Sequence, residues 1–214
     1  MPKRPAQQLF VAALVLGASS SSAVAQQATV VTPMRGWMTW ERFTCETDCA
    51  QFPETCISER LIRTMADAMH RDGFVDAGYN YIQIDDCWAA GQRDPSGAIV
   101  PDPVRFPSGM KALADYVHSK GMKLGLYGDI GDATCGGFIG FNVSATPDPI
   151  ADAKLAADAG TMMGWGMDSL KVDGCAKNNT AAALVMNITY PKLGAALKAA
   201  ARKAGKPAPW YSCS

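Results

Sequence analysis

Short apolar runs alternate with longer helical patterns along most of the chain. The runs indicate strands that end near Trp40, Ile84, Tyr127, Val172 and Tyr211. Intervals of roughly 40 to 45 residues separate these ends, and each interval contains a segment of helical periodicity. Parallel strands need crossover connections of this kind. The pattern therefore predicts an α/β fold built from repeated strand-helix units.

The helical segments carry the residues that usually begin and end helices. Ser108 and Asp148 are predicted to begin two of them as capping residues, and glycine follows most of them. Apolar residues in the first segment recur three and four positions apart, as on one buried face. The predicted helices cover segments 61–72, 108–120, 148–159 and 190–204.

Acidic residues follow directly on several predicted strands, namely Asp85, Asp86, Asp129 and Asp173. An open dinucleotide-binding sheet would place a glycine-rich loop after its first strand, but segment 36–40 is Gly-Trp-Met-Thr-Trp. In (β/α)8 barrels, by contrast, active sites are built on the rim formed by the carboxyl ends of the strands. We therefore expect a (β/α)8 TIM barrel, truncated after about the fifth strand.

Composition narrows the chemistry. The 214 residues have a formal net charge of zero and are 48% hydrophobic and 19% charged, which excludes a disordered tail or a basic nucleic-acid-binding domain. The two histidines, His70 and His118, are too few for a three-histidine metal site. We expect no metal and no cofactor, and carboxylates become the candidate catalytic groups.

The first 25 residues indicate a secretory signal peptide. Lys3 and Arg4 precede an apolar run at 9–18, and Ala-Val-Ala at 23–25 has the small-residue pattern of a cleavage site. The alternative, a membrane anchor, would need a run of roughly 20 residues. No later run is long enough to span a bilayer. The exported part would be 26–214, destined for secretion or for the lysosome or vacuole.

Export changes the interpretation of the cysteines. All seven follow residue 25, and an oxidising compartment favours disulfides, so an odd number leaves one cysteine unpaired. Glycosylation sequons begin at Asn142, Asn178 and Asn187. They are typical of a glycoprotein, although each can also occur by chance.

Lys171 and Asp173 lie two positions apart on one predicted strand, so their side chains share a face. A neighbouring ammonium favours the ionised carboxylate that a nucleophile requires. Two alternatives remain. The pair can be a structural ion pair, or Lys171 can be a Schiff-base lysine, which an adjacent aspartate opposes.

Asp85 and Asp86 end another strand, so one should face the pocket while the other sits beside it in the loop. Two adjacent carboxylates can accept hydrogen bonds from neighbouring hydroxyls of a sugar. A metal site is less favoured because Asp94 is the sole further oxygen ligand in the local sequence, and turn formation is a third option. Nearby tryptophans can stack on a sugar or can belong to the core. They are Trp37, Trp40 and Trp88.

Spaced motifs over residues 34–214 connect these segments. They are Gly36-Trp37, Trp40-Glu41-Arg42-Phe43, Cys56-Ile57-Ser58-Glu59, Ile84-Asp85-Asp86-Cys87-Trp88, Arg105-Phe106-Pro107, Lys123-Leu124-Gly125 with Tyr127, Lys171 with Asp173-Gly174-Cys175, and Tyr211-Ser212-Cys213. Together they resemble the α-galactosidase and α-N-acetylgalactosaminidase family of retaining glycoside hydrolases. The resemblance implies the N-terminal portion of a (β/α)8 catalytic domain in residues 26–214.

The resemblance also implies roles for individual residues. Asp173 would be the nucleophile that forms a covalent glycosyl-enzyme intermediate. Three disulfides would form, Cys45 with Cys87, Cys49 with Cys56 and Cys135 with Cys175, leaving Cys213 without a partner. The implied substrate-binding residues are Trp40, Asp85, Asp86, Tyr127, Lys171 and Ser214.

In relatives, the general acid/base aspartate lies further along the chain than Ser214. Retention requires two carboxylates roughly 5 to 5.5 Å apart. We therefore expect the 214-residue chain to be inactive by itself, as the N-terminal part of a longer domain, since barrels take roughly 250 residues.

The resemblance places Ser214 beside the substituent at C2 of the sugar. Galactose-specific members have glutamate there, and acetamido-specific members have serine, whose small side chain leaves room for an N-acetyl group. The expected substrate is therefore a glycoconjugate or oligosaccharide with a terminal α-linked galactose-type residue, with a preference for N-acetylgalactosamine. The alternatives are a strict α-galactosidase and a non-catalytic sugar-binding barrel. No nucleic-acid partner is expected, and a homodimer of the full-length protein is compatible with the resemblance.

Overall fold

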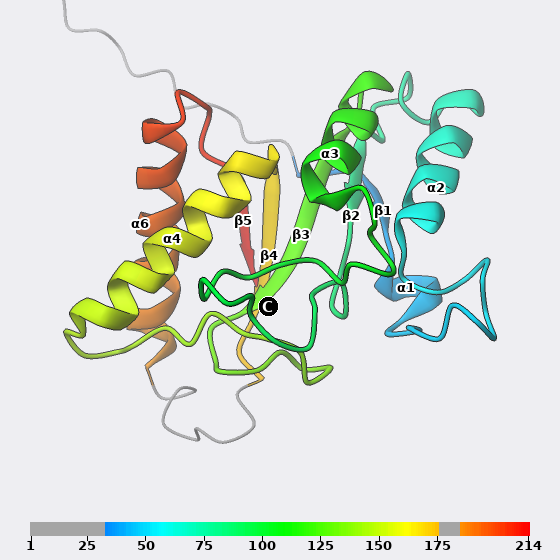
Figure 1. Cartoon of the computed structure of the whole chain (residues 1–214). Helices are drawn as coiled ribbons and strands as arrows, with labels where there is room; N and C mark the ends of the chain where they lie inside the picture. Colours follow the sequence, from blue (N-terminus) through cyan, green and yellow to red (C-terminus); the bar gives the residue numbers. More distant parts are fainter. Residues whose placement is uncertain (1–32, 176–184) are drawn as a thin grey trace, which may run out of the picture. The chain divides into compact units, whose positions relative to one another are not determined.

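Five parallel strands form a single sheet in the computed structural model, which describes residues 33–175 and 185–214 (Figure 1). The strands follow one another across the sheet in chain order, and every neighbouring pair is parallel. They are β1 (Gly36–Met38), β2 (Tyr81–Gln83), β3 (Lys123–Asp129), β4 (Ser169–Asp173) and β5 (Trp210–Cys213). The predicted signal peptide at 1–25 and the sequon at Asn178 lie outside the described residues.

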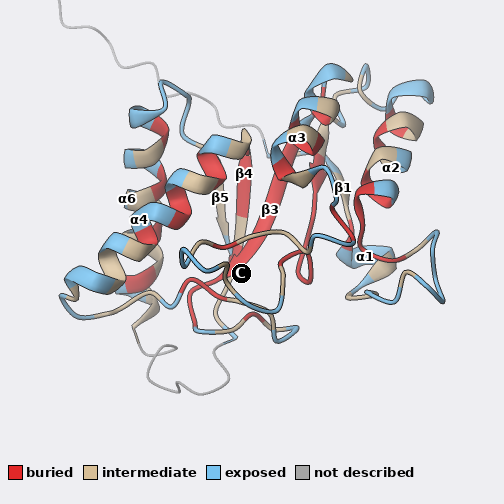
Figure 2. Cartoon of the chain, in the orientation of Figure 1, coloured by how far each residue is buried: buried red, intermediate tan, exposed pale blue. Residues whose placement is uncertain are grey.

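Helices occupy the connections, as the sequence predicts. They are α1 (Trp40–Phe43), α2 (Glu59–Arg71), α3 (Gly109–Ser119), α4 (Pro149–Trp165) and α6 (Met186–Lys203). In α2, α3, α4 and α6 the buried positions gather on one side of the helix and the exposed positions on the other (Figure 2). No helix in the described part of the chain is long and apolar enough to cross a membrane.

Side chains cap two of these helices at the amino end, and the sequence predicts the second of the two caps, by Asp148. Ser58 accepts a hydrogen bond from the Leu61 amide (3.3 Å), and Asp148 accepts from the Ile150 amide (3.0 Å). The predicted cap by Ser108 is wrong, since its side chain makes no capping bond and its own N–H donates to the Glu59 carboxylate (3.0 Å). Helix α6 begins before the predicted start at residue 190 and runs through Pro191, because a proline near the start of a helix removes a single hydrogen bond.

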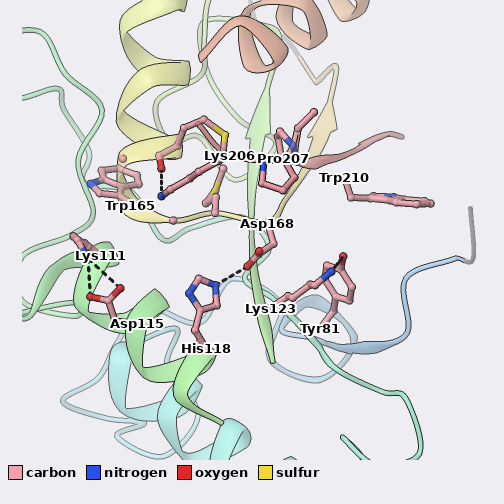
Figure 3. Close-up of a pocket in the computed structure, with 16 residues that line it drawn as sticks. Tyr81, Lys111, Asp115, His118, Lys123, Trp165, Asp168, Lys206, Pro207 and Trp210 are labelled. Carbon is pink, nitrogen blue, oxygen red and sulfur yellow. Dashed lines mark hydrogen bonds and ion pairs between the residues drawn. The ribbon is translucent and has the colours of Figure 1, made fainter. Parts of the chain in front are cut away.

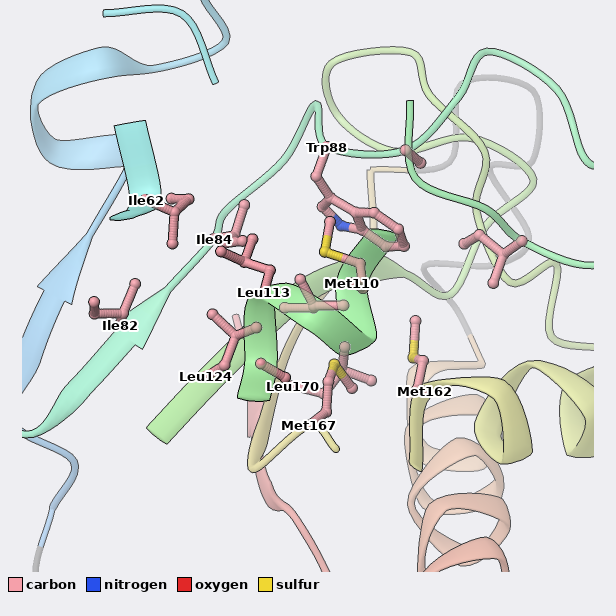
Figure 4. Close-up of a cluster of buried hydrophobic side chains, with 14 of the residues drawn as sticks. Ile62, Ile82, Ile84, Trp88, Met110, Leu113, Leu124, Met162, Met167 and Leu170 are labelled. Carbon is pink, nitrogen blue, oxygen red and sulfur yellow. The ribbon is translucent and has the colours of Figure 1, made fainter. Parts of the chain in front are cut away.

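The strands present two different faces, because successive side chains point to opposite sides of a sheet. One face is apolar and packs with the helices: Ile82, Leu124 and Leu170 are fully buried and lie in one hydrophobic cluster with Leu113 of α3 (Figure 4). Burial of apolar surface of this kind is the main stabilising contribution to the fold. The opposite face is polar and carries the candidate site.

A polar layer crosses the sheet on this second face. Gln83, Gly125 and Ser169 are register partners on β2, β3 and β4, and the Ser169 hydroxyl donates to Gln83 Oε1 (2.9 Å). A Cβ atom at residue 125 would lie 1.9 Å from Gln83 Oε1 and 2.0 Å from Ser169 Oγ. Glycine therefore leaves the space in which the two neighbouring side chains bond.

Three disulfides connect the loops at the carboxyl end of the sheet. They are Cys45–Cys87, Cys49–Cys56 and Cys135–Cys175, with Cα–Cα distances of 5.6, 5.1 and 5.0 Å, and they are the pairs that the family resemblance implies. Cys213 is free and exposed on β5. Closing loops of about 40 residues in this way stabilises a fold by roughly 4 kcal/mol each in a chain-entropy treatment.

Candidate active site

Four of the predicted site residues, Asp85, Tyr127, Lys171 and Asp173, meet at the carboxyl end of the sheet, where the strand register aligns them. Tyr127 on β3 is the partner of Lys171 on β4, and one level further along Asp129 is the partner of Asp173. Both levels lie on the polar face. Residues that are far apart in the sequence thus converge on the edge that forms the rim in barrels.

Lys171 connects two of the carboxylates. Its ammonium nitrogen lies 2.9 Å from Asp85 Oδ2 and 3.9 Å from Asp173 Oδ2. The sequence predicts the second contact from strand alternation, but the shorter contact, to a residue on another strand, is found in the structure alone. A Schiff base needs a neutral amine with a free lone pair, whereas the Lys171 ammonium, which donates to the Asp85 carboxylate, has none, so the aldolase-like alternative is not supported.

Asp173 is held in place by a second donor. The Tyr127 hydroxyl donates to Asp173 Oδ2 (2.8 Å), and Cys135 Sγ lies 3.5 Å from the same oxygen. Burial is the main cause that raises the pKa of Tyr127, and the hydrogen bond to Asp173 adds to it, so the phenol keeps its proton. One oxygen of the carboxylate, Oδ2, therefore accepts from a neutral donor and lies near a cation.

Asp85 and Asp86 are both 1% exposed, but they point to different partners. Asp85 faces Lys171, and its backbone N–H donates to the Thr39 hydroxyl (2.9 Å). Asp86 accepts hydrogen bonds from the amides of Cys87 and Gly136, both at 2.6 Å. One carboxylate therefore faces Lys171 and the other connects the loops, so turn formation accounts for part of the Asp-Asp motif.

The aromatic residues divide between the core and the surface. Trp88 is buried and its indole N–H donates to the Tyr127 carbonyl (2.9 Å), which is the core alternative. Trp40 is 40% exposed and opens the short helix α1, so the predicted strand end there is wrong, since β1 stops at Met38. Ser214 is exposed, and its carbonyl accepts a hydrogen bond from the Tyr190 hydroxyl (3.1 Å).

The sequence predicts that Asp129 lies at the rim but indicates no role for it. In the structure its side chain is completely buried. Burial is the largest cause that raises its pKa, to about 6, and the charges of Asp173 and Asp86 act in the same direction. Asp129, Cys135 and Cys175 also present ligand atoms within 4.8 Å of one another. The two cysteines form a disulfide, however, and offer no thiolate to a metal.

A hollow of about 520 Å³ lies at the other end of the sheet, where the strands begin (Figure 3). His118 Nε2 lies 2.7 Å from Asp168 Oδ2, and the Lys206 ammonium donates to the Met163 carbonyl (2.9 Å). The polar groups here are paired with one another. The concentration of carboxylates around a lysine is found at the carboxyl end, where barrel enzymes carry their active sites.

A parallel sheet with charged side chains gathered at its carboxyl end defines a barrel protein with an enzyme-like site. A family model described as "Alpha galactosidase A" matches residues 32–214. The chain belongs to this family, whose members include glycosidases.

Named relatives agree with the family match. Alpha-N-acetylgalactosaminidase of Gallus gallus is 47% identical over 183 residues, which cover 86% of this chain and 41% of that protein. Alpha-galactosidase A of Homo sapiens is 50% identical over 144 residues, which cover 67% of this chain and 31% of that protein. The chain thus spans less than half the length of these relatives.

Solved structures give the same result. Alpha-galactosidase I from Mortierella vinacea matches with a TM-score of 0.67 and 33% identity, over 88% of this chain and 42% of that chain. Alpha-galactosidase from Saccharomyces cerevisiae matches with a TM-score of 0.66 and 31% identity, over 85% of this chain and 35% of that chain. The predicted barrel fold is confirmed, with the five strands as a partial barrel.

Proposed function

We propose that the protein hydrolyses terminal α-linked galactose-type residues with retention of configuration, and that Asp173 is the nucleophile. The observation that carries this proposal is the arrangement around Asp173. Its carboxylate accepts a hydrogen bond from the Tyr127 hydroxyl (2.8 Å) and lies 3.9 Å from the Lys171 ammonium. A carboxylate oriented in this way suits attack on an anomeric carbon. Family membership supports the reaction class.

The reaction proceeds in two displacements. An Asp173 oxygen forms a bond to C1 of the sugar as the bond from C1 to the leaving oxygen breaks, and a second carboxyl group protonates that oxygen. Water then attacks C1 and releases Asp173, while the second carboxylate accepts the proton from water. Lys171 and Asp85 would hold sugar hydroxyls, and Trp40 and Tyr127 would form the wall of the pocket.

The second carboxylate is not supplied by the carboxylates described at this edge. Asp85 is bound to Lys171, Asp86 to two amides, and Asp129 to the amides of Gly131 and Cys175. None of them is free to approach a leaving group. We therefore propose that these 214 residues do not turn over substrate without an acid/base from elsewhere in the protein.

Product stereochemistry tests the proposal. Protein expressed from the complete reading frame should release the α-anomer first from an aryl α-galactoside or its acetamido analogue, as followed by proton NMR. The 214-residue chain, assayed in parallel, should show no turnover that depends on Asp173. Initial release of the β-anomer would overturn the proposed mechanism. Specific sugar binding without any turnover by the complete protein would favour the non-catalytic sugar-binding barrel.

Ser214 is the proposed determinant of sugar preference, and it favours N-acetylgalactosamine. We expect the complete protein to hydrolyse the acetamido substrate more efficiently than the plain galactoside. Ser214→Glu should reverse this preference, with a change of about 10- to 100-fold in the ratio of the two kcat/KM values, because the longer carboxylate fills the space of the N-acetyl group. Ser119→Glu, at an exposed serine at the end of α3, is the control. An unchanged ratio in Ser214→Glu would exclude this role and favour a strict α-galactosidase.

The cellular setting follows from the same proposal. The cleavable signal predicted at 1–25 would direct the protein into the secretory pathway, where the three disulfides can form. Its partners would be glycoconjugates or oligosaccharides rather than nucleic acids.

A further inference from the structure

Asp129 is a buried carboxylate to which the proposed reaction gives no role. Its side chain is 0% exposed and accepts two backbone hydrogen bonds, from Gly131 (2.7 Å) and from Cys175 (2.8 Å). Among the described residues it forms no ion pair, while Asp85 and Asp173 lie near the Lys171 ammonium. A buried charge without a cation is costly, so its position requires an explanation.

The two hydrogen bonds of Asp129 connect the segments that follow neighbouring strands. Gly131 begins the loop after β3, and Cys175 lies two residues beyond Asp173 at the end of β4. The backbone adds a third connection, since the Ile130 amide donates to the Asp173 carbonyl (3.0 Å). The Cys135–Cys175 disulfide joins the same two segments covalently. The Asp129 carboxylate thus fixes the backbone of Cys175, two residues after Asp173.

We propose that Asp129 is a positioning residue, which holds the backbone after β4 so that the Asp173 carboxylate is aimed at the anomeric carbon. This inference rests on the proposed function of Asp173. Each oxygen of Asp129 already accepts a backbone hydrogen bond, from Gly131 or from Cys175, so Asp129 acts through the nucleophile rather than on the substrate.

The charge environment makes this positioning dependent on pH. The charged and titratable groups that influence Asp129 come from several elements, namely Asp173 on β4, Asp86 after β2, Tyr127 on β3 and Tyr190 on α6. Burial raises the pKa of Asp129 to about 6. Below that pH Asp129 is protonated, and one of its two hydrogen bonds from backbone amides becomes weaker, since a protonated oxygen is a poorer acceptor.

The rate at which Asp173 is labelled tests the proposal directly. An α-galactosyl fluoride with a second fluorine on the ring is a suitable probe: Asp173 bonds to C1, fluoride leaves with its electron pair, and the ester persists. Fluoride departure needs no proton donor, so the rate reports the nucleophile. We expect Asp129→Asn in the complete protein to be labelled at least tenfold more slowly than wild type, with the inhibition constant for free galactose within about twofold. Asp132→Asn, at an exposed aspartate in the same loop, should behave as wild type.

The pH dependence of wild type provides a second measurement should Asp129→Asn fail to fold. Labelling should rise with pH through a one-proton step near the Asp129 pKa of about 6. Equal labelling rates in Asp129→Asn and wild type, or a flat wild-type profile between about pH 5 and 7, would overturn the inference. Failure of wild type to be labelled at Asp173 at any pH would instead overturn the proposed function.

Discussion

Replacement of Asp173 by glycine is expected to lower kcat/KM for an aryl α-galactoside at least about 10³-fold, because no other group can form the covalent intermediate. Substrate binding should persist, since Lys171 and Asp85 remain paired in the variant. Initial-rate kinetics, together with the inhibition constant for galactose, separate the loss of chemistry from the loss of binding.

Chemical rescue distinguishes a nucleophile from a structural aspartate. Azide can occupy the space left in Asp173→Gly, attack C1 from the same face and yield the β-galactosyl azide when an activated aryl group leaves. Asp132→Gly, at an exposed site, should retain wild-type rates and form no azide product. If Asp173→Gly keeps its activity, or regains it with azide but gives the α-azide, Asp173 is not the nucleophile.

Replacement of Lys171 by methionine is the second change with a large expected effect. It leaves the Asp85 carboxylate, with its side chain 2% exposed, without its cation. Breaking a buried pair of this kind destabilises a fold by about 3 kcal/mol. We also expect kcat/KM to fall by about 10²-fold, because Asp173 loses the neighbouring positive charge. Chemical denaturation and steady-state kinetics measure the two effects.

Lys123→Met is the matched control for this substitution. Lys123 is also a strand lysine, but it is exposed at the amino end of β3, where its ammonium lies 3.3 Å from the Tyr81 hydroxyl. Its replacement should change the free energy of unfolding by less than about 0.5 kcal/mol. Equal effects of the two substitutions on stability and catalysis would show that Lys171 is an ordinary surface residue.

Much of the architecture could be predicted because strands and helices leave periodic patterns. The alternation of side chains places Lys171 and Asp173 on one face, and their 3.9 Å contact agrees with it. Element ends were less predictable. The structure ends β1 at Met38 where the apolar run continued to Trp40, and β3 extends past Tyr127 to include Asp129. Hydrophobicity does not mark the residue at which backbone pairing stops.

The decisive contacts of the site could not be predicted from local sequence. Asp85 and Lys171 are 86 residues apart, and their pairing depends on the order of strands in the sheet. The burial of Asp129 depends on how the loops after β3 and β4 pack over it, and aspartate at a strand end is usually exposed. Strand order and loop packing are global properties of the fold, so nothing in the sequence around Asp129 indicates that it is buried.

The Cys135–Cys175 disulfide has a practical consequence for anyone producing this protein. It joins the loop that contacts Asp173 to the segment that follows Asp173, so chains made in a bacterial cytoplasm, which keeps thiols reduced, would lack this connection together with the other two disulfides. An activity measured on such a preparation would describe the reduced chain and not the disulfide-bonded fold. The oxidation state of the three disulfides should therefore be determined in every sample whose activity is measured.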